Sequence, residues 1–225
     1  MTSEGELFFL RKLSDVKAAF EQSDIKVEQE RFRRAGSPDG RWYYSLTAVP
    51  FRPGRPVLLG LNWGVNKATG HEPQTDYPQK RAWLDVASYP HVKADRSRIE
   101  ESALGPLSEL NYFNVCPFRS NGIDELTDND WRLGISAFFN ETMEFLAPPV
   151  ALFQGTSGLE KLREHGLADF RPVVVTRSNK RSTGFVGWLR TGTHQTPFYA
   201  IPRPRDLHSE AEKALLWNSI LAETP

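Results

Sequence analysis

Two asparagines stand where side-chain amides are unusual. Asn62 lies in the run Gly60-Leu61-Asn62-Trp63-Gly64, directly after the apolar residues 57–59, and Asn114 lies inside the apolar segment 112–116. An amide offers two N–H donors and an oxygen acceptor, so it can bind the edge of a planar ligand or orient a water molecule. An amide within an apolar strand must be hydrogen-bonded or used. The flanking glycines would let a ligand approach the backbone, although Asn62 is equally interpreted as a left-handed turn residue that caps a helix.

Short apolar strands separated by helices would position these side chains. We expect strands at residues 57–61, 112–116, 150–153 and 198–202, the second of them closed by Pro117. Solid apolar strands that alternate with helices indicate a parallel sheet covered on both faces. The sequence therefore predicts a three-layer α/β fold around a central, mostly parallel four-stranded sheet with helices on both faces. Ligands bind such sheets at the carboxyl ends of the strands, where Asn62 falls.

The N-terminal part shows a different pattern. Residues 7–20 have helical spacing, whereas residues 25–33 and 42–49 are interpreted as strands of a hairpin around a turn at residues 36–40. We therefore divide the chain into an N-terminal extension, residues 1–52, made of helices and a hairpin packed on the main domain, and an α/β domain, residues 53–225.

Further helices are expected in the α/β domain. One covers residues 94–104, and another follows a capping box at Thr127 and Asp130. A last helix begins with a second box, at Ser209 and Glu212. Residues 171–176 are a further candidate strand, and the basic stretch that continues to Thr196 is interpreted as irregular.

Composition limits the functional classes. The 225-residue chain has one cysteine, Cys116, which excludes a disulfide framework and favours a reducing, cytoplasmic setting. No apolar run approaches the ~20 residues of a membrane span, and no signal pattern opens the chain. The five histidines show no metal-ligand spacing, so we expect no metal and no cofactor. We also expect a monomer that does not associate with membranes.

The net charge of zero hides an uneven distribution. Residues 171–205 contain no Asp or Glu, and they carry seven basic residues: Arg171, Arg177, Lys180, Arg181, Arg190, Arg203 and Arg205. Such a segment is typical of a surface that faces a polyanion such as DNA, and the alternative is an ordinary basic face.

Three strand ends together resemble the motifs of the uracil-DNA glycosylase superfamily, closest to its single-strand-selective monofunctional and mismatch-specific branches. They are residues 60–64, 114–118 and 201–205. In the family, the first motif reads Gly-x-Asn-Pro-Gly. The middle strand carries Asn, often followed by x-Cys-Pro, and the last motif reads His or Asn-Pro-Ser-x-Arg. The resemblance extends roughly from Pro53 to Ile220.

The resemblance implies a uracil-DNA glycosylase-like fold and a monofunctional DNA glycosylase, a hydrolase that acts in base excision and DNA repair. Excision requires a base flipped out of the stack. By resemblance, Asn62 would position the attacking water, Asn114 would bind the edge of the base, and Tyr77 would stack on its face. The remaining base-binding residues would be Gly60, Leu61, Trp63 and Ile201. Lys180, Arg181, Arg203 and Arg205 would contact single- or double-stranded DNA.

The chain departs from the family pattern at three positions. Ile201 stands where the family has His or Asn to stabilise the leaving base, and loss of such a donor costs about a hundredfold to a thousandfold in rate. His194 or His208 could replace the donor, although each is also explained as a surface histidine. Trp63 replaces Pro and could fill the base pocket, and Arg203 replaces Ser.

These departures keep a second hypothesis open. A catalytically inactive descendant would bind DNA or a free nucleobase without cleaving it. An unrelated α/β hydrolase or nucleotide-binding protein is disfavoured, because the chain lacks Gly-x-Ser-x-Gly, a phosphate-loop lysine motif and Gly-x-Gly-x-x-Gly.

Overall fold

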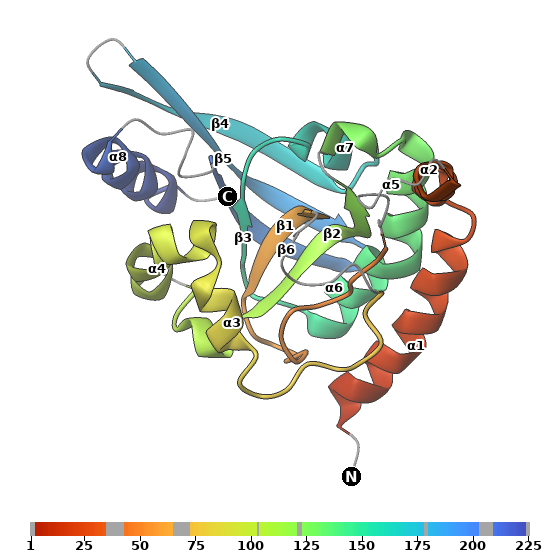
Figure 1. The fold of residues 1–225 in the computed structure, drawn as a ribbon. Helices are drawn as coiled ribbons and strands as arrows, with labels where there is room; N and C mark the ends of the chain where they lie inside the picture. The colour runs from red at the N-terminus through yellow and green to blue at the C-terminus, as the bar shows by residue number, and fades with distance from the viewer. Residues whose placement is uncertain are drawn as a thin grey trace.

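The structure is a computed structural model that describes residues 3–34, 43–64, 73–102, 104–120, 123–177, 180–202 and 209–223. Within these residues a six-stranded mixed sheet has the order β2-β1-β3-β6-β5-β4 (Figure 1). The strands are β1 (Val57–Gly64), β2 (Asn111–Ser120), β3 (Ala151–Gln154), β4 (Ala168–Arg177), β5 (Lys180–Thr191) and β6 (His194–Ile201).

The predicted strands at residues 57–61, 112–116, 150–153 and 198–202 correspond to β1, β2, β3 and β6. β1 is parallel to β2 and β3, and β3 is parallel to β6. β5 is antiparallel to both β4 and β6. The prediction of an α/β fold with a mostly parallel sheet is confirmed. The predicted number of strands, four, was too small, because the β4–β5 hairpin adds two strands to the sheet.

The interpretation of the basic stretch as irregular was wrong. Its glycines permit close approach to β4 and to α8. A Cβ on Gly187 would lie 2.1 Å from the carbonyl oxygen of Asp169 on β4, and one on Gly184 would lie 2.1 Å from Cδ1 of Ile220 on α8. Glycine in a strand often marks such an approach. Val186, which lies between the two glycines, and Leu189, which follows Gly187 by two residues, are fully buried.

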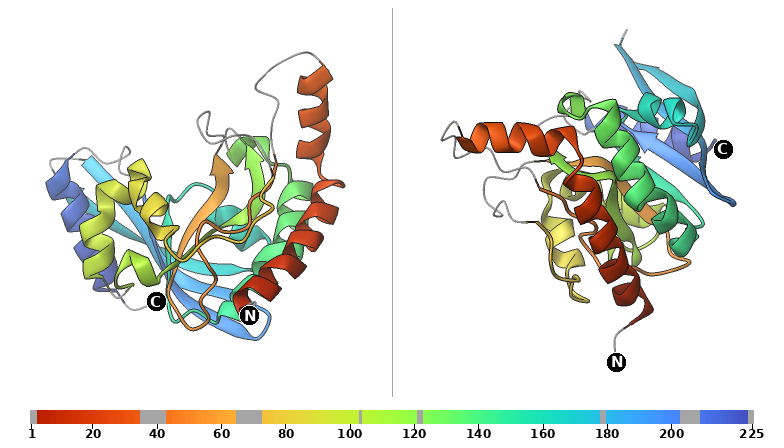
Figure 2. Two further views of the ribbon diagram at one scale, coloured as in Figure 1. Left: turned by 60° about the horizontal axis from the view of Figure 1, so that its bottom comes forward. Right: turned by 90° about the vertical axis from the view of Figure 1, so that its right-hand side faces the viewer.

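Helices cover both faces of the sheet (Figure 2). One face, here called the first face, carries α1 (Glu4–Phe20), α5 (Asp128–Gly134) and α6 (Asn140–Leu146), the last two joined by the π-helical residues Ile135–Phe139. The second face carries α3 (Trp83–Ser88), α4 (Pro90–Glu101) and α8 (Glu210–Leu221). The other helices are α2 (Asp24–Arg34), α7 (Leu159–Glu164) and the 3-10 turns Leu107–Glu109 and Ile123–Glu125.

Alternate strand residues enter two separate cores, as the two-residue period of a strand requires. The first-face core contains Phe9, Leu59, Phe113, Trp131 and Phe153. The second-face core contains Leu58, Val92, Leu152, Ile201 and Trp217. This alternation determines which strand side chains can share a site.

The predicted N-terminal hairpin was wrong. Residues 25–33 form part of α2, and the described residues 43–49 make only isolated bridges to β2, at Tyr44 and Thr47. The alternation of Ile25 and Val27 with charged residues suggested a strand, but a distant side chain caps a helix here. Asp130 Oδ1 accepts hydrogen bonds from the backbone N–H groups of Asp24 and Ile25, at 2.8 and 3.1 Å. The turn predicted at residues 36–40 lies outside the described residues.

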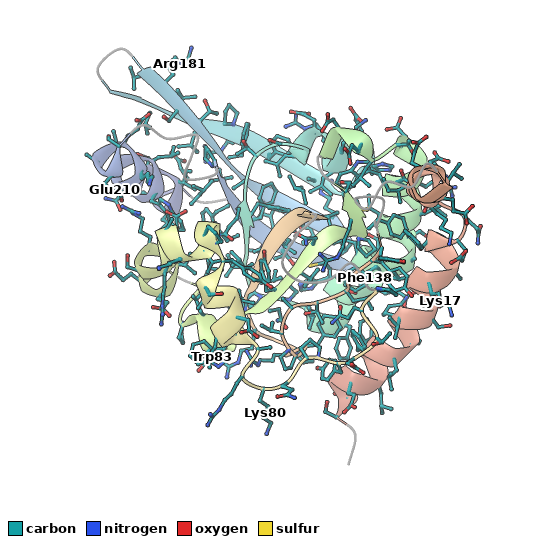
Figure 3. All side chains as sticks on the ribbon, viewed as in Figure 1. Lys17, Lys80, Trp83, Phe138, Arg181 and Glu210 are labelled. Carbon is teal, nitrogen blue, oxygen red and sulfur yellow. The ribbon has the colours of Figure 1, made fainter. Side chains whose placement is uncertain are left out.

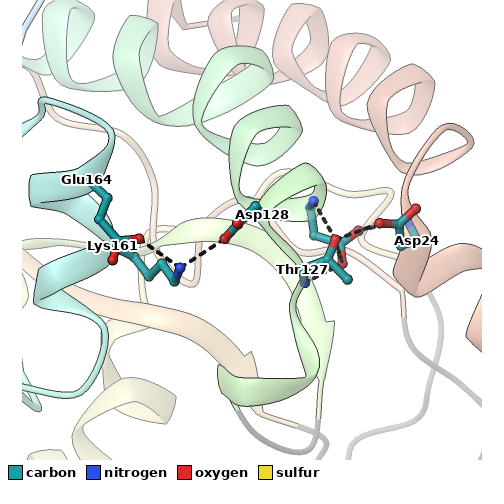
Figure 4. A network of polar contacts seen from close by, with 6 residues as sticks. Asp24, Thr127, Asp128, Lys161 and Glu164 are labelled. Atoms are coloured by element: carbon teal, nitrogen blue, oxygen red, sulfur yellow. Dashed lines mark hydrogen bonds and ion pairs between the residues drawn. The ribbon is translucent and has the colours of Figure 1, made fainter.

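The capping box at Thr127 and Asp130 is confirmed. Residues in and next to this box connect α2, α5 and α7 (Figure 4). Thr127 Oγ1 donates to Asp24 at 2.7 Å, while Lys161 of α7 bonds to Asp128 at 2.9 Å.

The second predicted box is half present. Ser209 Oγ accepts the backbone N–H of Glu212 at 3.2 Å, but the carboxylate of Glu212 accepts from Ser182 of β5. This side chain therefore attaches α8 to the β4–β5 hairpin.

Pro117 does not close its strand, because β2 continues to Ser120. Proline lacks an N–H group and is tolerated at sheet edges and irregularities. β2 is an edge strand, and its register with β1 shifts between Asn62 and Trp63, next to Pro117.

In the described part of the chain, no helix has both the length and the apolar character needed to cross a membrane.

Candidate functional site

Residues from four parallel strands form one row, which crosses the middle of β1 and β2 and the carboxyl ends of β3 and β6. Gly60 pairs with Asn114, and Gln154 pairs with Ile201. Leu59 pairs with Phe153, so Gly60 and Gln154 follow at the next position. The row therefore reads Asn114, Gly60, Gln154, Ile201 across β2, β1, β3 and β6.

Asn114 lies directly against Gly60. Its side chain is only 2% exposed, and a Cβ added to Gly60 would lie 1.8 Å from Asn114 Oδ1 and 3.0 Å from Cγ. No real Cβ tolerates such distances. Gly60 therefore provides the space that the amide of Asn114 occupies, which is a structural reason for a glycine at this point of β1.

The strand register also brings Asn62 near Asn114. Asn62 pairs with Cys116, two residues beyond Asn114 on the neighbouring strand. Strand spacing and rise place the two asparagine Cα atoms about 8 Å apart. The side chains of Asn62 and Trp63 lie outside the described residues. Leu61, which precedes Asn62, is 4% exposed and packs in the first-face core, so only its backbone is available to a ligand on the second face.

Ile201 ends the row within the second-face core. It is 3% exposed, and its carbonyl oxygen accepts the N–H of Gly155 at 2.8 Å. His194 lies at the opposite end of β6, where its ring nitrogen is 3.4 Å from the carbonyl oxygen of Pro148. Seven residues of strand separate it from Ile201 by about 23 Å, so His194 cannot replace a donor there. His208 lies outside the described residues.

Tyr77 is held by the first-face core. Its hydroxyl accepts the backbone N–H of Phe51 at 2.7 Å, and its ring centroid lies 5.3 Å from that of Phe9. Burial raises the pKa of this hydroxyl. A stacking role would therefore use only the part of the ring that remains exposed.

The acid-free segment of the sequence acquires acidic partners in the fold. Arg171 pairs with Glu223 at 2.6 Å, and Arg190 lies 3.5 Å from Asp169. Arg181 is exposed near the end of the β4–β5 hairpin (Figure 3). Arg203 and Arg205 lie outside the described residues, as does the side chain of Lys180.

An open hollow of about 590 Å³ lies beside the outer edge of β2. Its described lining consists of Ser45, Thr47, Ala48, Gln74, Asp76, Tyr77, Pro78, Gln79, Arg81, Ala82, Asp85, Tyr89 and Arg119. Of the base-binding residues expected from the sequence, this lining includes Tyr77. The described lining does not include Gly60, Leu61, Asn114 or Ile201.

Arg119 is the most buried cation of this hollow. Its Nε and Nη2 atoms lie 3.1 and 2.8 Å from Ser45 Oγ. Burial lowers the pKa of Arg119, whereas the nearby Tyr89 hydroxyl acts in the opposite direction. Sequence reasoning missed this residue. The signal available was a charged side chain at the carboxyl end of an apolar strand.

Gln74 holds the wall of the hollow in place. Its Nε2 donates to the carbonyl oxygen of Thr47 at 2.9 Å, and its Oε1 accepts the N–H groups of Leu46 and Thr47 at 2.7 and 3.2 Å. The Gln74 amide thus makes the backbone hydrogen bonds that a neighbouring strand would otherwise make to residues 46–47. These bonds fix this wall of the hollow without a ligand.

Among the described residues, no cluster of three or more His, Cys, Asp or Glu side chains could hold a metal ion. Cys116 is buried, and burial raises the pKa of its thiol. Comparisons with models of known protein families and with curated protein sequences gave no match to this chain.

Proposed function

We propose that this protein is a monofunctional DNA glycosylase-like enzyme that binds a flipped uracil, or another deaminated or modified base, and hydrolyses its N-glycosidic bond. One observation carries the proposal. The amide of Asn114 on β2 lies on Gly60 of β1, and Asn62 follows two residues further along β1, towards the carboxyl end of the strand. Ligands of open α/β sheets bind at these strand ends.

The chemistry uses two amides for different tasks. Asn114 can donate to O4 of uracil and accept from N3–H, because one amide carries both groups. Asn62 can accept a hydrogen bond from a water molecule and direct its oxygen towards C1′ of the sugar. The C1′–N bond then breaks and its electron pair leaves with the base, while the water forms the sugar hydroxyl and its lost proton ends on the departing base anion.

The test is cleavage of oligonucleotides that contain uracil, hypoxanthine or xanthine, followed by strand scission at abasic sites on a gel. We expect abasic product from at least one of them. Asn62→Ala should reduce the rate about a hundredfold or more, because the water loses its positioning group. Asn129→Ala, which removes an amide from α5, is the matched control and should retain activity. Absence of abasic product from all three substrates would contradict the proposal.

One observation favours the second hypothesis, a protein that binds DNA or a nucleobase without cleaving it. Ile201 ends the row, and its aliphatic side chain cannot stabilise a leaving base anion. We expect Ile201→Asn to raise the excision rate about a hundredfold, since a single such donor has this effect in other enzymes. The rate is measured per folded molecule, because an amide at this buried position also lowers stability.

The two hypotheses differ in a simple measurement. Salt-sensitive binding of single-stranded DNA, with no turnover by the wild-type protein or by Ile201→Asn, would favour the inactive binder. Turnover that Asn62→Ala abolishes would exclude it.

A further inference from the structure

β4 lies at one edge of the sheet, at the end of the strand order. Its register decides which backbone groups face β5. Leu167, the residue before β4, accepts the N–H of Arg190 at 2.8 Å. Opposite residues of an antiparallel pair exchange such bonds at every second position. The odd-numbered residues of β4 therefore direct their N–H and C=O groups towards β5, and the even-numbered residues direct theirs outward.

Two features close the first half of this outward edge. The carbonyl oxygen of Phe170 accepts a hydrogen bond from Arg163 Nη2 of α7 at 2.8 Å, and the guanidinium carbon lies 3.7 Å from the centroid of the Phe170 ring. Pro172 has no N–H group, and proline is accepted on an edge strand where that group would face outward. Both features agree with the assignment of the outward residues. Natural proteins protect sheet edges with such devices.

The second half of the edge is open. Val174 and Thr176 direct their N–H and C=O groups outward, and in the described part of the chain no hydrogen bond reaches these groups from outside β4 and β5. The end of the hairpin projects beyond the helices (Figure 1). Val174 is 40% exposed, whereas Val173 and Val175 on the other face lie in the core under α8. An extended segment can therefore add to β4 here by main-chain hydrogen bonds.

The charges at the end of the hairpin select the partner. Arg181 is exposed and pairs with Thr176, so its side chain lies on the same face of the hairpin as that of Val174 (Figure 3). Residues 171–205 contain no Asp or Glu. A second copy of this chain would bring the same cations against one another, and like charges on paired strands are destabilising. An acidic strand would meet opposite charges instead.

We propose that the open half of β4 binds an extended acidic peptide, which adds as a further strand beside Val174 and Thr176 with its carboxylates near Arg181. In this kind of recognition the main-chain hydrogen bonds supply affinity and the side chains supply specificity. Attraction between the charges speeds the encounter and weakens with salt. The inference does not depend on base excision, because it uses neither Asn62 nor Asn114.

The test is a titration of a fluorescein-labelled heptapeptide of alternating glutamate and valine with the full chain. Fluorescence anisotropy should show saturable binding that weakens in high salt. The same peptide with lysine in place of glutamate should bind at least about tenfold more weakly. Hydrogen exchange of the wild-type protein locates the contact. Bound peptide should slow exchange at the amides of Val174 and Thr176 and leave the amides of Val173 and Val175, which face β5, unchanged.

Two substitutions separate the main-chain contact from the charge. Thr176→Pro removes one outward N–H and no hydrogen bond to β5, so it should weaken peptide binding about fivefold to tenfold. Thr176→Ala keeps the N–H and is the matched control, with wild-type affinity expected. Arg181→Ala should weaken binding about threefold, which is typical of one exposed ion pair, whereas Arg132→Ala on α5 should have no effect.

Three results would overturn the proposal. The first is no binding of the acidic peptide, or binding without slower exchange at Val174 and Thr176. The second is a dimer in sedimentation that Thr176→Pro dissociates, because a second copy would then occupy the edge. The third is salt-sensitive binding of a thymine oligonucleotide that displaces the peptide and is unchanged in Thr176→Pro, because the hairpin would then be a nucleic-acid surface.

Discussion

Replacing Gly60 by alanine is expected to lower the free energy of unfolding by about 2 kcal/mol and to displace the amide of Asn114. The new Cβ would lie 1.8 Å from Asn114 Oδ1, so the side chain has to leave its position. If Asn114 binds the base, excision is lost together with stability. Urea unfolding and the oligonucleotide cleavage assay measure the two effects.

A double-mutant cycle isolates the contact between these residues. Asn114→Ala removes the group that clashes, so Gly60→Ala should cost at least about 1 kcal/mol less in that background than in the wild type. Gly184→Ala is the matched control, because its Cβ would collide with Ile220 of α8 instead. Its effect should add to that of Asn114→Ala. Additive effects for Gly60 and Asn114 would show that the two side chains do not compete for one space.

Asp130→Ala is expected to lower the free energy of unfolding by about 4 kcal/mol, the largest effect among these variants. Asp130 is 0% exposed. Its carboxylate accepts the backbone N–H groups of Asp24, Ile25 and Thr127, at distances from 2.8 to 3.1 Å. Alanine leaves the first turn of α2 and the start of α5 without this acceptor.

Asp128→Ala provides the comparison, since Asp128 belongs to the same turn but is exposed. Its ion pair with Lys161 lies at the surface, where such pairs contribute little, and thermal unfolding should barely change. Hydrogen exchange should also become faster in residues 24–30 of Asp130→Ala and remain unchanged in Asp128→Ala. Equal stability of the two variants would mean that Asp130 does not hold α2.

Local patterns sufficed where an element depends on its own residues. The apolar runs at residues 57–61, 112–116, 150–153 and 198–202 identified the parallel strands, because strands buried on both faces must be apolar throughout. The box at Thr127 and Asp130 identified a helix start, because both partners lie within one turn. The same runs also placed Asn62 and Asn114 on separate strands, but both strands continue beyond the predicted ends, β1 to Gly64 and β2 to Ser120.

Only the tertiary structure decided the features that join distant parts of the chain. α2 is a helix where the pattern suggested a strand, because Asp130, more than a hundred residues away, caps its first N–H groups. The glycines of β5 serve close approach to β4 and α8, which no local pattern reveals.

The same division holds for the candidate sites. The sequence alone determined an α/β domain with a mostly parallel sheet, two amides on its strands and a basic, acid-free segment. The fold decided that Glu223 and Asp169 lie against that segment, and that Ser45 meets Arg119 across 74 residues to form a hollow. Periodicity reports which side of an element is buried, whereas charge pairing and cavities depend on which elements become neighbours.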